Sequence, residues 1–410
     1  MDFSFTKYSK NITNQLTSLP LFVRWCLMLL LISVCIGTAS ALFLHSLQWV
    51  TAVRDTHRYL IYFLPIAGWL IGYFYKKYGQ SVVQGVDLVL VNVKKPHYAR
   101  IPWQMAPFVY GATLFTHLFG GSAGREGTAL QIAGSISDQF TKIFGFSNDD
   151  RKLLMYAALA GGFGSVFGTP FAGAVFGIEV CRTKITSIKS IYIPFISAML
   201  SHAVANMWRA PHSTYEVAYI PALDITALLY ILLAAICFGL CSRLFCIAQD
   251  TLHHFFKKQI PSLPWKAFVG GLAVLCIVWL SQGYDFMGLG LPLIAQSFTE
   301  PSLGYYFLLK LLLTTITLSS GFKGGEVTPL FFIGATLGSF LSGWIDLPTA
   351  LMASMGFVAV FAGCTKTPIA CSIMAWELFG WKVVLFTTLA CILAYFVSGK
   401  HTIYKAQREV

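Results

Sequence analysis

Residues 120–128 of this chain read GGSAGREGT, and residues 321–329 read GFKGGEVTP. A glycine, a glutamate and a threonine coincide in the two stretches at a constant offset of 200 residues. The three pairs are Gly124 with Gly324, Glu126 with Glu326, and Thr128 with Thr328. Because glutamates are rare inside apolar segments, their coincidence favours an internal duplication over chance.

A second pair of motifs supports the duplication. Thr169-Pro170 precedes Glu179 by the same spacing at which Thr367-Pro368 precedes Glu377. Transporters are commonly built from two such repeats, often inverted, with the transport site where the repeats meet. The expected division is an N-terminal cytoplasmic segment (1–24), a first transmembrane repeat (25–208), an inter-repeat loop (209–223), a second transmembrane repeat (224–399), and the end of the last helix with the C-terminus (400–410).

The composition places most of the chain in a lipid bilayer. Of its 410 residues, 56% are hydrophobic and only 11% are charged, and the mean hydropathy is +0.67. These values exclude a disordered chain, a nucleic-acid-binding module and almost any soluble enzyme. Stretches without Asp, Glu, Lys or Arg that approach the length of a spanning helix are 25–53, 59–75, 101–124, 153–178, 190–208, 225–242, 267–284, 327–345, 347–365 and 383–399. Shorter apolar pieces at 127–137 and 286–299 are typical of broken or re-entrant helices, which indicate a transport pathway.

The positive charge is interpreted through membrane topology. The formal net charge is +12, with Lys7, Lys10 and Arg24 before the first apolar stretch and Lys400, Lys405 and Arg408 after the last. Lys and Arg gather in cytoplasmic segments, so both termini are expected to be cytoplasmic. The first stretch is too long for a cleaved signal peptide. The ten cysteines lie in apolar segments without a CxxC pair, so we expect neither disulfides nor a metal site, and no cofactor.

The two glycine-rich stretches have the chemistry of an anion site. Each one leads into an apolar segment, which predicts a helix that begins at membrane depth with free backbone N–H groups and the positive end of its dipole. Glu126 can occupy such a site as a carboxylate and leave it when protonated, which would couple anions to protons. Glu326 is interpreted either as a second proton carrier or as a structural carboxylate, and Thr328 as an anion ligand or a donor to its own helix. Glu179 and Glu377 are expected to be structural or to lie at a cytoplasmic mouth, and Lys310 is expected to pair with a carboxylate or carbonyls.

These motifs resemble the CLC family of chloride channels and chloride/proton antiporters over almost the whole chain. The GREG sequence at 124–127 resembles the motif that carries the family's gating glutamate, here Glu126. Residues 168–179 (GTPFAGAVFGIE) resemble the helix that follows this motif in the family. Residues 399–407 (GKHTIYKAQ) resemble the end of the family's last helix, which carries an ion-contacting tyrosine, here Tyr404. The resemblance implies an all-α fold with two inverted repeats, broken helices at a central anion site, and a homodimer with one pore per subunit. The implied anion-binding residues are Gly85, Val86, Gly124, Arg125, Gly127, Gly325, Val327, Thr328 and Tyr404.

Departures from the chloride-transporting pattern point to the fluoride-exporting branch of this family. Residues 84–88 (QGVDL) lack the serine of the family's first motif, for which Val86 is the nearest match, and Thr128 replaces a proline. The third motif contains Glu326 and Thr328, which the fluoride branch associates with transport and with fluoride recognition. Val180 stands where chloride/proton antiporters have a second glutamate for the inner proton route; the fluoride branch also lacks it.

The sequence therefore predicts a bacterial cell-membrane transporter that exports fluoride in exchange for protons. Two alternatives stay within the family: a chloride/proton antiporter and a passive anion channel. A remote alternative is an intramembrane enzyme that uses Ser122 as nucleophile and His117 as base. The later repeat has Phe322 at the position of Ser122, and a duplicated catalytic motif would not lose its nucleophile.

Overall fold

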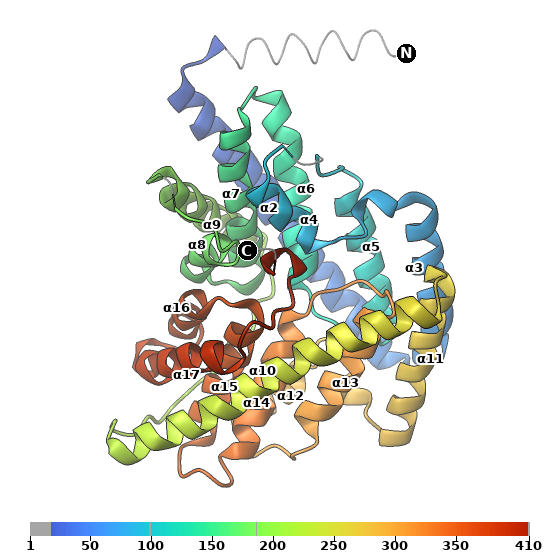
Figure 1. Ribbon diagram of the computed structural model, residues 1–410, viewed down its shortest axis with the longest axis vertical. Helices are drawn as coiled ribbons and strands as arrows, with labels where there is room; N and C mark the ends of the chain where they lie inside the picture. Colours follow the sequence, from blue (N-terminus) through green and yellow to red (C-terminus); the bar gives the residue numbers. More distant parts are fainter. Residues whose placement is uncertain (1–17, 98–99, 186, 409–410) are drawn as a thin grey trace.

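The computed structural model describes residues 18–97, 100–185 and 187–408, and within these residues the regular structure is entirely helical (Figure 1). The α-helices are α2 (Leu21–Thr56), α3 (Leu64–Tyr78), α4 (Val86–Lys94), α5 (Met105–Leu118), α6 (Glu126–Ile143), α7 (Asn148–Phe167), α8 (Pro170–Glu179), α9 (Lys189–Met207), α10 (Ile225–Gln259), α11 (Leu263–Ser281), α12 (Leu291–Gln296), α13 (Tyr306–Ser319), α14 (Val327–Leu341), α15 (Thr349–Thr365), α16 (Pro368–Phe379) and α17 (Val384–Val397). The predicted fold class is confirmed. Lys7 and Lys10, on which the expected orientation partly depends, lie outside the described residues.

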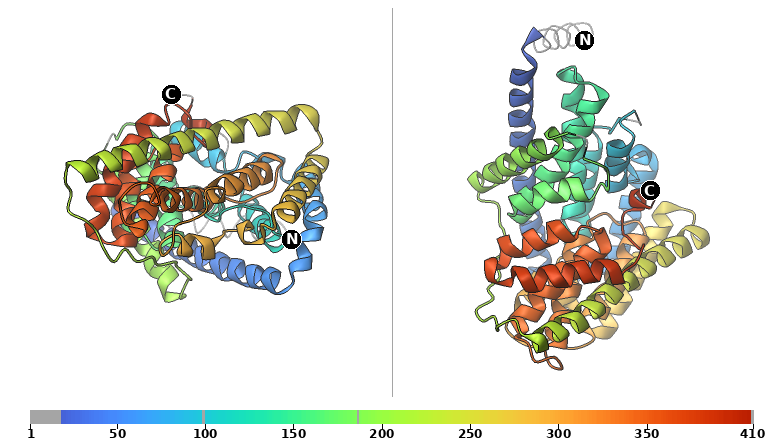
Figure 2. Two further views of the ribbon diagram at one scale, coloured as in Figure 1. Left: turned by 90° about the horizontal axis from the view of Figure 1, so that it is seen from below. Right: turned by 60° about the vertical axis from the view of Figure 1, so that its left-hand side comes forward.

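The two longest helices, α2 and α10, lie on opposite faces of the molecule. Figure 2 (left) shows α2 in blue along the lower edge and α10 in yellow-green along the upper edge. These two helices and α11 are long and apolar enough to cross a membrane, whereas several other apolar helices of the described chain contain only 10–17 residues. Short apolar helices meet inside the molecule, where protein surrounds their ends and supplies hydrogen-bond partners.

Three boundary predictions were wrong for identifiable reasons. The expected stretch 153–178 is two helices, α7 and α8, because Gly168 adopts a left-handed conformation (φ +77°) that ends α7 before Pro170 begins α8. Residues 127–137 are not a separate short piece, because they belong to the 18-residue helix α6. Tyr404 is not in the last helix: α17 ends at Val397, and Gly399 (φ +63°) turns the chain away.

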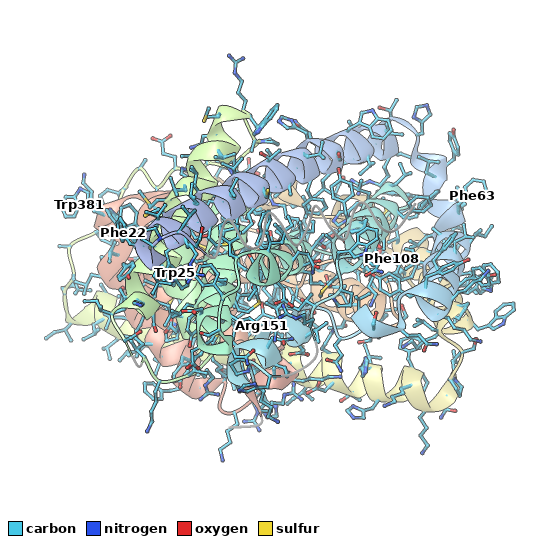
Figure 3. The ribbon with its side chains drawn as sticks, turned by 90° about the horizontal axis from the view of Figure 1, so that it is seen from above. Phe22, Trp25, Phe63, Phe108, Arg151 and Trp381 are labelled. Atoms are coloured by element: carbon cyan, nitrogen blue, oxygen red, sulfur yellow. The ribbon has the colours of Figure 1, made fainter. Side chains whose placement is uncertain are left out.

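Helices α7, α14 and α15 form the centre of the molecule. In α15 every residue from Leu351 to Thr365 is buried, and α14 packs along it. A helix buried on all sides needs apolar residues all round, as found here. The periphery exposes both aliphatic and aromatic side chains. Figure 3 places Trp381 and Phe63 at opposite edges, and both side chains are exposed, as expected for surfaces that face lipid.

Helices α8 and α16 cap each other across the two repeats. The Glu377 carboxylate, near the end of α16, accepts hydrogen bonds from the backbone N–H groups of Phe171 (2.9 Å) and Ala172 (2.8 Å) at the start of α8. In return the Glu179 carboxylate accepts hydrogen bonds from the N–H groups of Ile369 (3.1 Å) and Ala370 (2.8 Å) at the start of α16. The two matched glutamates therefore complete the free helix ends of the opposite repeat.

Candidate anion site

The two glycine-rich stretches meet in the middle of the molecule. Gly124 and Gly325 form a two-residue antiparallel bridge, in which the Gly124 N–H donates to the Gly325 carbonyl (2.5 Å) and the Gly325 N–H donates to the Gly124 carbonyl (2.8 Å). A Cβ atom at Gly325 would lie 2.6 Å from the Gly127 nitrogen. Only glycine allows the backbones to approach this closely. The bridge holds the first turns of α6 and α14 side by side.

The Glu126 carboxylate occupies the space between these two helix starts. It is fully buried, and its Oε2 accepts hydrogen bonds from the backbone N–H groups of Arg125 (3.1 Å) and Thr328 (3.0 Å). Its Oε1 accepts a hydrogen bond from the Thr328 hydroxyl. The carboxylate thus accepts donors from both repeats. Donors arranged around a carboxylate in this way would serve equally for another anion.

Arg125 adds a positive charge to the same site. Its Nε lies 3.5 Å from the Glu126 Oε1, and the Arg125 side chain is almost completely buried. Burial strengthens the electrostatic attraction, because water does not screen the pair. The donors expected for an anion therefore surround the Glu126 carboxylate, which occupies the predicted anion site in this structure.

Gly127 lies where several predicted ligands converge. A Cβ atom at this position would lie 3.1 Å from the Gly325 Cα, 3.6 Å from a methyl group of Val86 and 3.7 Å from the Glu326 Oε2. Val86 begins α4 directly after Gly85, whose φ of +62° sets the direction of the helix. Val327 is buried in the first turn of α14.

Tyr404 contributes from the segment after α17. Its side chain is buried, and its hydroxyl has no hydrogen-bond partner among the described residues. Glu326, Asp87 and Glu126 lie close enough to act on this hydroxyl electrostatically. The segment itself is attached to α4, since the Asp87 carboxylate accepts a hydrogen bond from the Ala406 N–H (3.0 Å). The structure therefore brings all the predicted ligands into one region.

The other singled-out residues have separate partners. Lys310, buried in α13, donates to the carbonyls of Phe286 (2.8 Å) and Gly288 (2.7 Å), as one of its two predicted pairings requires. The Ser122 hydroxyl hydrogen-bonds to that of Thr314 (2.9 Å). Both ring nitrogens of His117 lie against backbone carbonyls. Ser122 and His117 therefore do not form the nucleophile and base that the enzyme alternative needs.

Two residues near the site were missed in the sequence. Thr113 of α5 shares a hydrogen bond with the hydroxyl of Thr128 (2.7 Å). Gln131 donates from its side chain to the Gly127 carbonyl (3.0 Å) and lies beside Gly85. The spacing of four residues between Gly127 and Gln131 is one helical turn and would have indicated that contact. Nothing in the sequence near Thr113 marks its pairing.

Comparisons with known proteins agree with this arrangement. Residues 63–399 match the family described as voltage gated chloride channel. A chloride/fluoride channel protein from Pseudomonas syringae pv. tomato is 40% identical over 400 residues, which cover 96% of this chain and 88% of the relative. The crystal structure of a CLC-type fluoride/proton antiporter superposes with a TM-score of 0.91 and 33% identity, over 95% of this chain and 100% of the other.

A more distant structure shares the fold. The structure of a slow cyanobacterial Cl⁻/H⁺ antiporter superposes with a TM-score of 0.79 at 17% identity, over 92% of this chain and 94% of that one. The family match covers most of this chain, and the Pseudomonas relative aligns with 96% of this chain. This chain belongs to the voltage-gated chloride channel (CLC) family.

Proposed function

We propose that this protein is a secondary active transporter that exports fluoride in exchange for protons. The observation that carries the proposal is the Glu126 carboxylate, which accepts backbone N–H donors from both repeats and the hydroxyl of Thr328. A carboxylate in that position excludes an anion from the same donors. The site therefore admits either the charged glutamate or the anion.

Protonation decides which of the two is bound. A neutral carboxylic acid accepts weaker hydrogen bonds than a carboxylate and loses its attraction to Arg125. Protonated Glu126 would then leave its donors, and an anion would take its place. Return of the deprotonated side chain would expel the anion, so that one proton moves against one anion in each exchange at this position.

The donors favour a small anion of high charge density. Fluoride needs short, strong hydrogen bonds to replace its water shell, and two backbone N–H groups with a threonine hydroxyl supply such bonds. The names of the relatives support this choice, because one is called a chloride/fluoride channel protein and another a fluoride/proton antiporter. Glu326, whose Oε2 lies next to Gly127, is the candidate for a second proton carrier.

The proposal extends to location and assembly. We place the protein in a bacterial cell membrane as a multi-pass protein with both termini in the cytoplasm, and as the homodimer with one pore per subunit that the resemblance implies. The proposed repeats comprise residues 25–208 and 224–399, joined by the loop 209–223. An exposed apolar groove of about 430 Å³ between α16 and α17, lined by Ile369, Trp376 and Trp381 among others, is a suitable contact surface for either lipid or a second subunit.

Flux measurements on the purified protein in liposomes test the function. We expect fluoride efflux from loaded vesicles to exceed chloride efflux, and a pH gradient to drive fluoride uphill. Glu126→Gln, which keeps the shape but cannot exchange a proton, should abolish the proton-driven component, whereas Glu216→Gln in the exposed loop should not. Chloride moving at least as fast as fluoride would favour the chloride/proton antiporter. Fluoride flux without proton flux would favour the passive channel.

A further inference from the structure

Four basic side chains from three separate elements meet near the turn that joins α10 to α11 (Figure 1). They are His253 and Lys257 in the last turns of α10, Lys266 in the first turn of α11, and Lys405 in the segment after α17. All three lysines lie close enough to the His253 imidazole to interact with it electrostatically, and Lys266 interacts with the two other lysines. These four residues are the cationic cluster.

The positive charge of the cationic cluster is not neutralised by an ion pair. Among the residues that the structure describes, no carboxylate oxygen lies within 4.0 Å of the amino groups of Lys257, Lys266 or Lys405. Asp250, one turn before the cluster in α10, pairs instead with Arg408 at 2.7 Å. Converging like charges repel each other, so an arrangement without a counter-charge in the protein is completed by an anion from outside it.

The cationic cluster lies where α10 leaves the hydrocarbon of the membrane. The helix has 35 residues, which makes it about 52 Å long against a hydrocarbon core of about 30 Å. Even at a tilt of about 40° it extends about 40 Å along the membrane normal. Trp265, at the start of α11, is 56% exposed, and tryptophan is enriched at the level of the lipid headgroups. The last turns of α10 therefore lie at headgroup depth.

Basic residues at the end of a spanning helix are expected from the cytoplasmic bias of Lys and Arg alone. That bias places the charges near the membrane surface, but it does not require them to converge. Here three elements direct cations at one partly buried imidazole, that of His253. Lys266 is itself partly buried against the turn between α13 and α14, since a Cβ atom at Gly321 would lie 3.5 Å from its Cε. The convergence points to a ligand.

We propose that the cationic cluster binds the phosphate headgroup of an anionic phospholipid in the adjacent leaflet. A lipid suits the site better than a free anion, because the exposed side chains of Trp265 and Phe255 beside the cluster can contact acyl chains. Basic groups at the end of a transmembrane helix attract anionic headgroups electrostatically. The site does not depend on which ion the protein transports.

Lys405 connects the lipid site to the rest of the molecule. It follows Tyr404 directly, in a segment that is joined to α4 by the hydrogen bond from the Ala406 N–H to the Asp87 carboxylate (3.0 Å). A headgroup bound to Lys405 and to the lysines of α10 and α11 would fasten this segment to both helices. The lipid would thus hold in place the segment that carries Tyr404.

Thermal unfolding of the full chain in nonionic detergent, with added short-chain phospholipid, tests the site. We expect phosphatidylglycerol to raise the unfolding midpoint and phosphatidylcholine, whose headgroup has no net charge, to leave it unchanged. Lys257→Gln and Lys266→Gln should each raise the half-saturating phosphatidylglycerol concentration about fivefold, the contribution of one lysine near an anionic surface. Lys258→Gln is the matched control, because Lys258 lies about 100° further round α10 and should not affect this concentration.

The same measurements without lipid separate lost binding from damage to the fold. Each substitution removes a repelling charge from the cationic cluster, so the midpoint without lipid should equal or exceed that of the wild type. A lower midpoint would contradict the uncompensated charge on which the inference depends. The lipid site is wrong if phosphatidylglycerol and phosphatidylcholine act alike, or if Lys257→Gln and Lys258→Gln bind phosphatidylglycerol equally. Sodium fluoride or inorganic phosphate that stabilises the protein as strongly as phosphatidylglycerol would identify a soluble anion as the ligand and would also overturn the lipid site.

Discussion

Replacement of Gly325 by alanine tests the contact on which the whole site depends. The added Cβ would lie 2.6 Å from the Gly127 nitrogen and 3.1 Å from the Glu126 nitrogen. Both are backbone atoms at the start of α6, so neither can turn away as the end of a long side chain could. The two glycine-rich turns would have to separate, and the two hydrogen bonds between Gly124 and Gly325 would lengthen or break.

The free-energy cost of this substitution combines steric overlap with broken hydrogen bonds. Overpacking costs about 1–3 kcal/mol and each broken backbone hydrogen bond about 0.5–1.5 kcal/mol, which gives roughly 2–6 kcal/mol in total. If the anion-bound state is destabilised by this amount, fluoride efflux should fall at least about 30-fold. The Glu126 carboxylate would be separated from its Thr328 donors at the same time, because these come from the other repeat.

Initial rates of fluoride efflux from liposomes measure the effect, and gel filtration in detergent confirms that the variant folds. Gly111→Ala in α5 is the control, because a Cβ at that position meets no atom within 4 Å. Efflux by Gly325→Ala within threefold of the wild type, with Gly111→Ala unchanged, would refute a site built from two abutting backbone turns.

Three further predictions concern single side chains. Thr328→Val should raise the half-saturating fluoride concentration in flux assays about tenfold or more, since a hydrogen bond to a charged acceptor contributes about 1.5–3 kcal/mol. Thr328→Ser keeps the hydroxyl and should resemble the wild type. Equal behaviour of the two variants would contradict this role of the hydroxyl. Glu377→Gln should lower the thermal unfolding midpoint in detergent, because it weakens two bonds to the start of α8, whereas the exposed Glu216→Gln should not change it. In the wild type the buried guanidinium of Arg151 pairs with Asp138 at 2.6 Å. Asp138→Asn removes this charge partner and should destabilise the protein by about 3 kcal/mol. A thermal unfolding midpoint equal to that of the wild type would show that the pair contributes nothing to stability.

The sequence predicted that the two glycine-rich stretches meet, because each contains a glutamate, which is rare in apolar segments. Glu126 and Glu326 are charges in apolar surroundings, so their coincidence stood out, and the structure brings their glycine-rich stretches together. Helix boundaries were harder to predict, since the break at Gly168 lies inside a continuous apolar run. Charge-free stretches identify segments that avoid water, but they do not show where a helix ends within protein.

Residues from outside the motifs could not be predicted. Tyr215 lies in a polar loop with no periodicity, and only its packing against Phe298 and Phe357 places it beside Arg125. Glu179 and Glu377 were predicted to be structural or at a cytoplasmic mouth. Their reciprocal caps were not predicted, because a sequence does not say which helix start a carboxylate will face. Such contacts depend on how the two halves pack together, since each carboxylate bonds to a helix about 200 residues away in the chain.

Comparison of the two glycine-rich stretches also explains why Glu126, and not Glu326, accepts hydrogen bonds from a threonine of the opposite stretch. Glu126 accepts a hydrogen bond from the hydroxyl of Thr328. In a symmetric arrangement, Glu326 would accept one from the hydroxyl of Thr128. That hydroxyl is instead shared with Thr113, while the residue 200 positions after Thr113 is the buried Leu313, which offers no such partner to Thr328. One polar residue in α5 therefore breaks the symmetry of the two halves. It leaves the donors of α14 free for the glutamate of α6 or for an anion, and it leaves Glu326 without the threonine hydroxyl that Glu126 has.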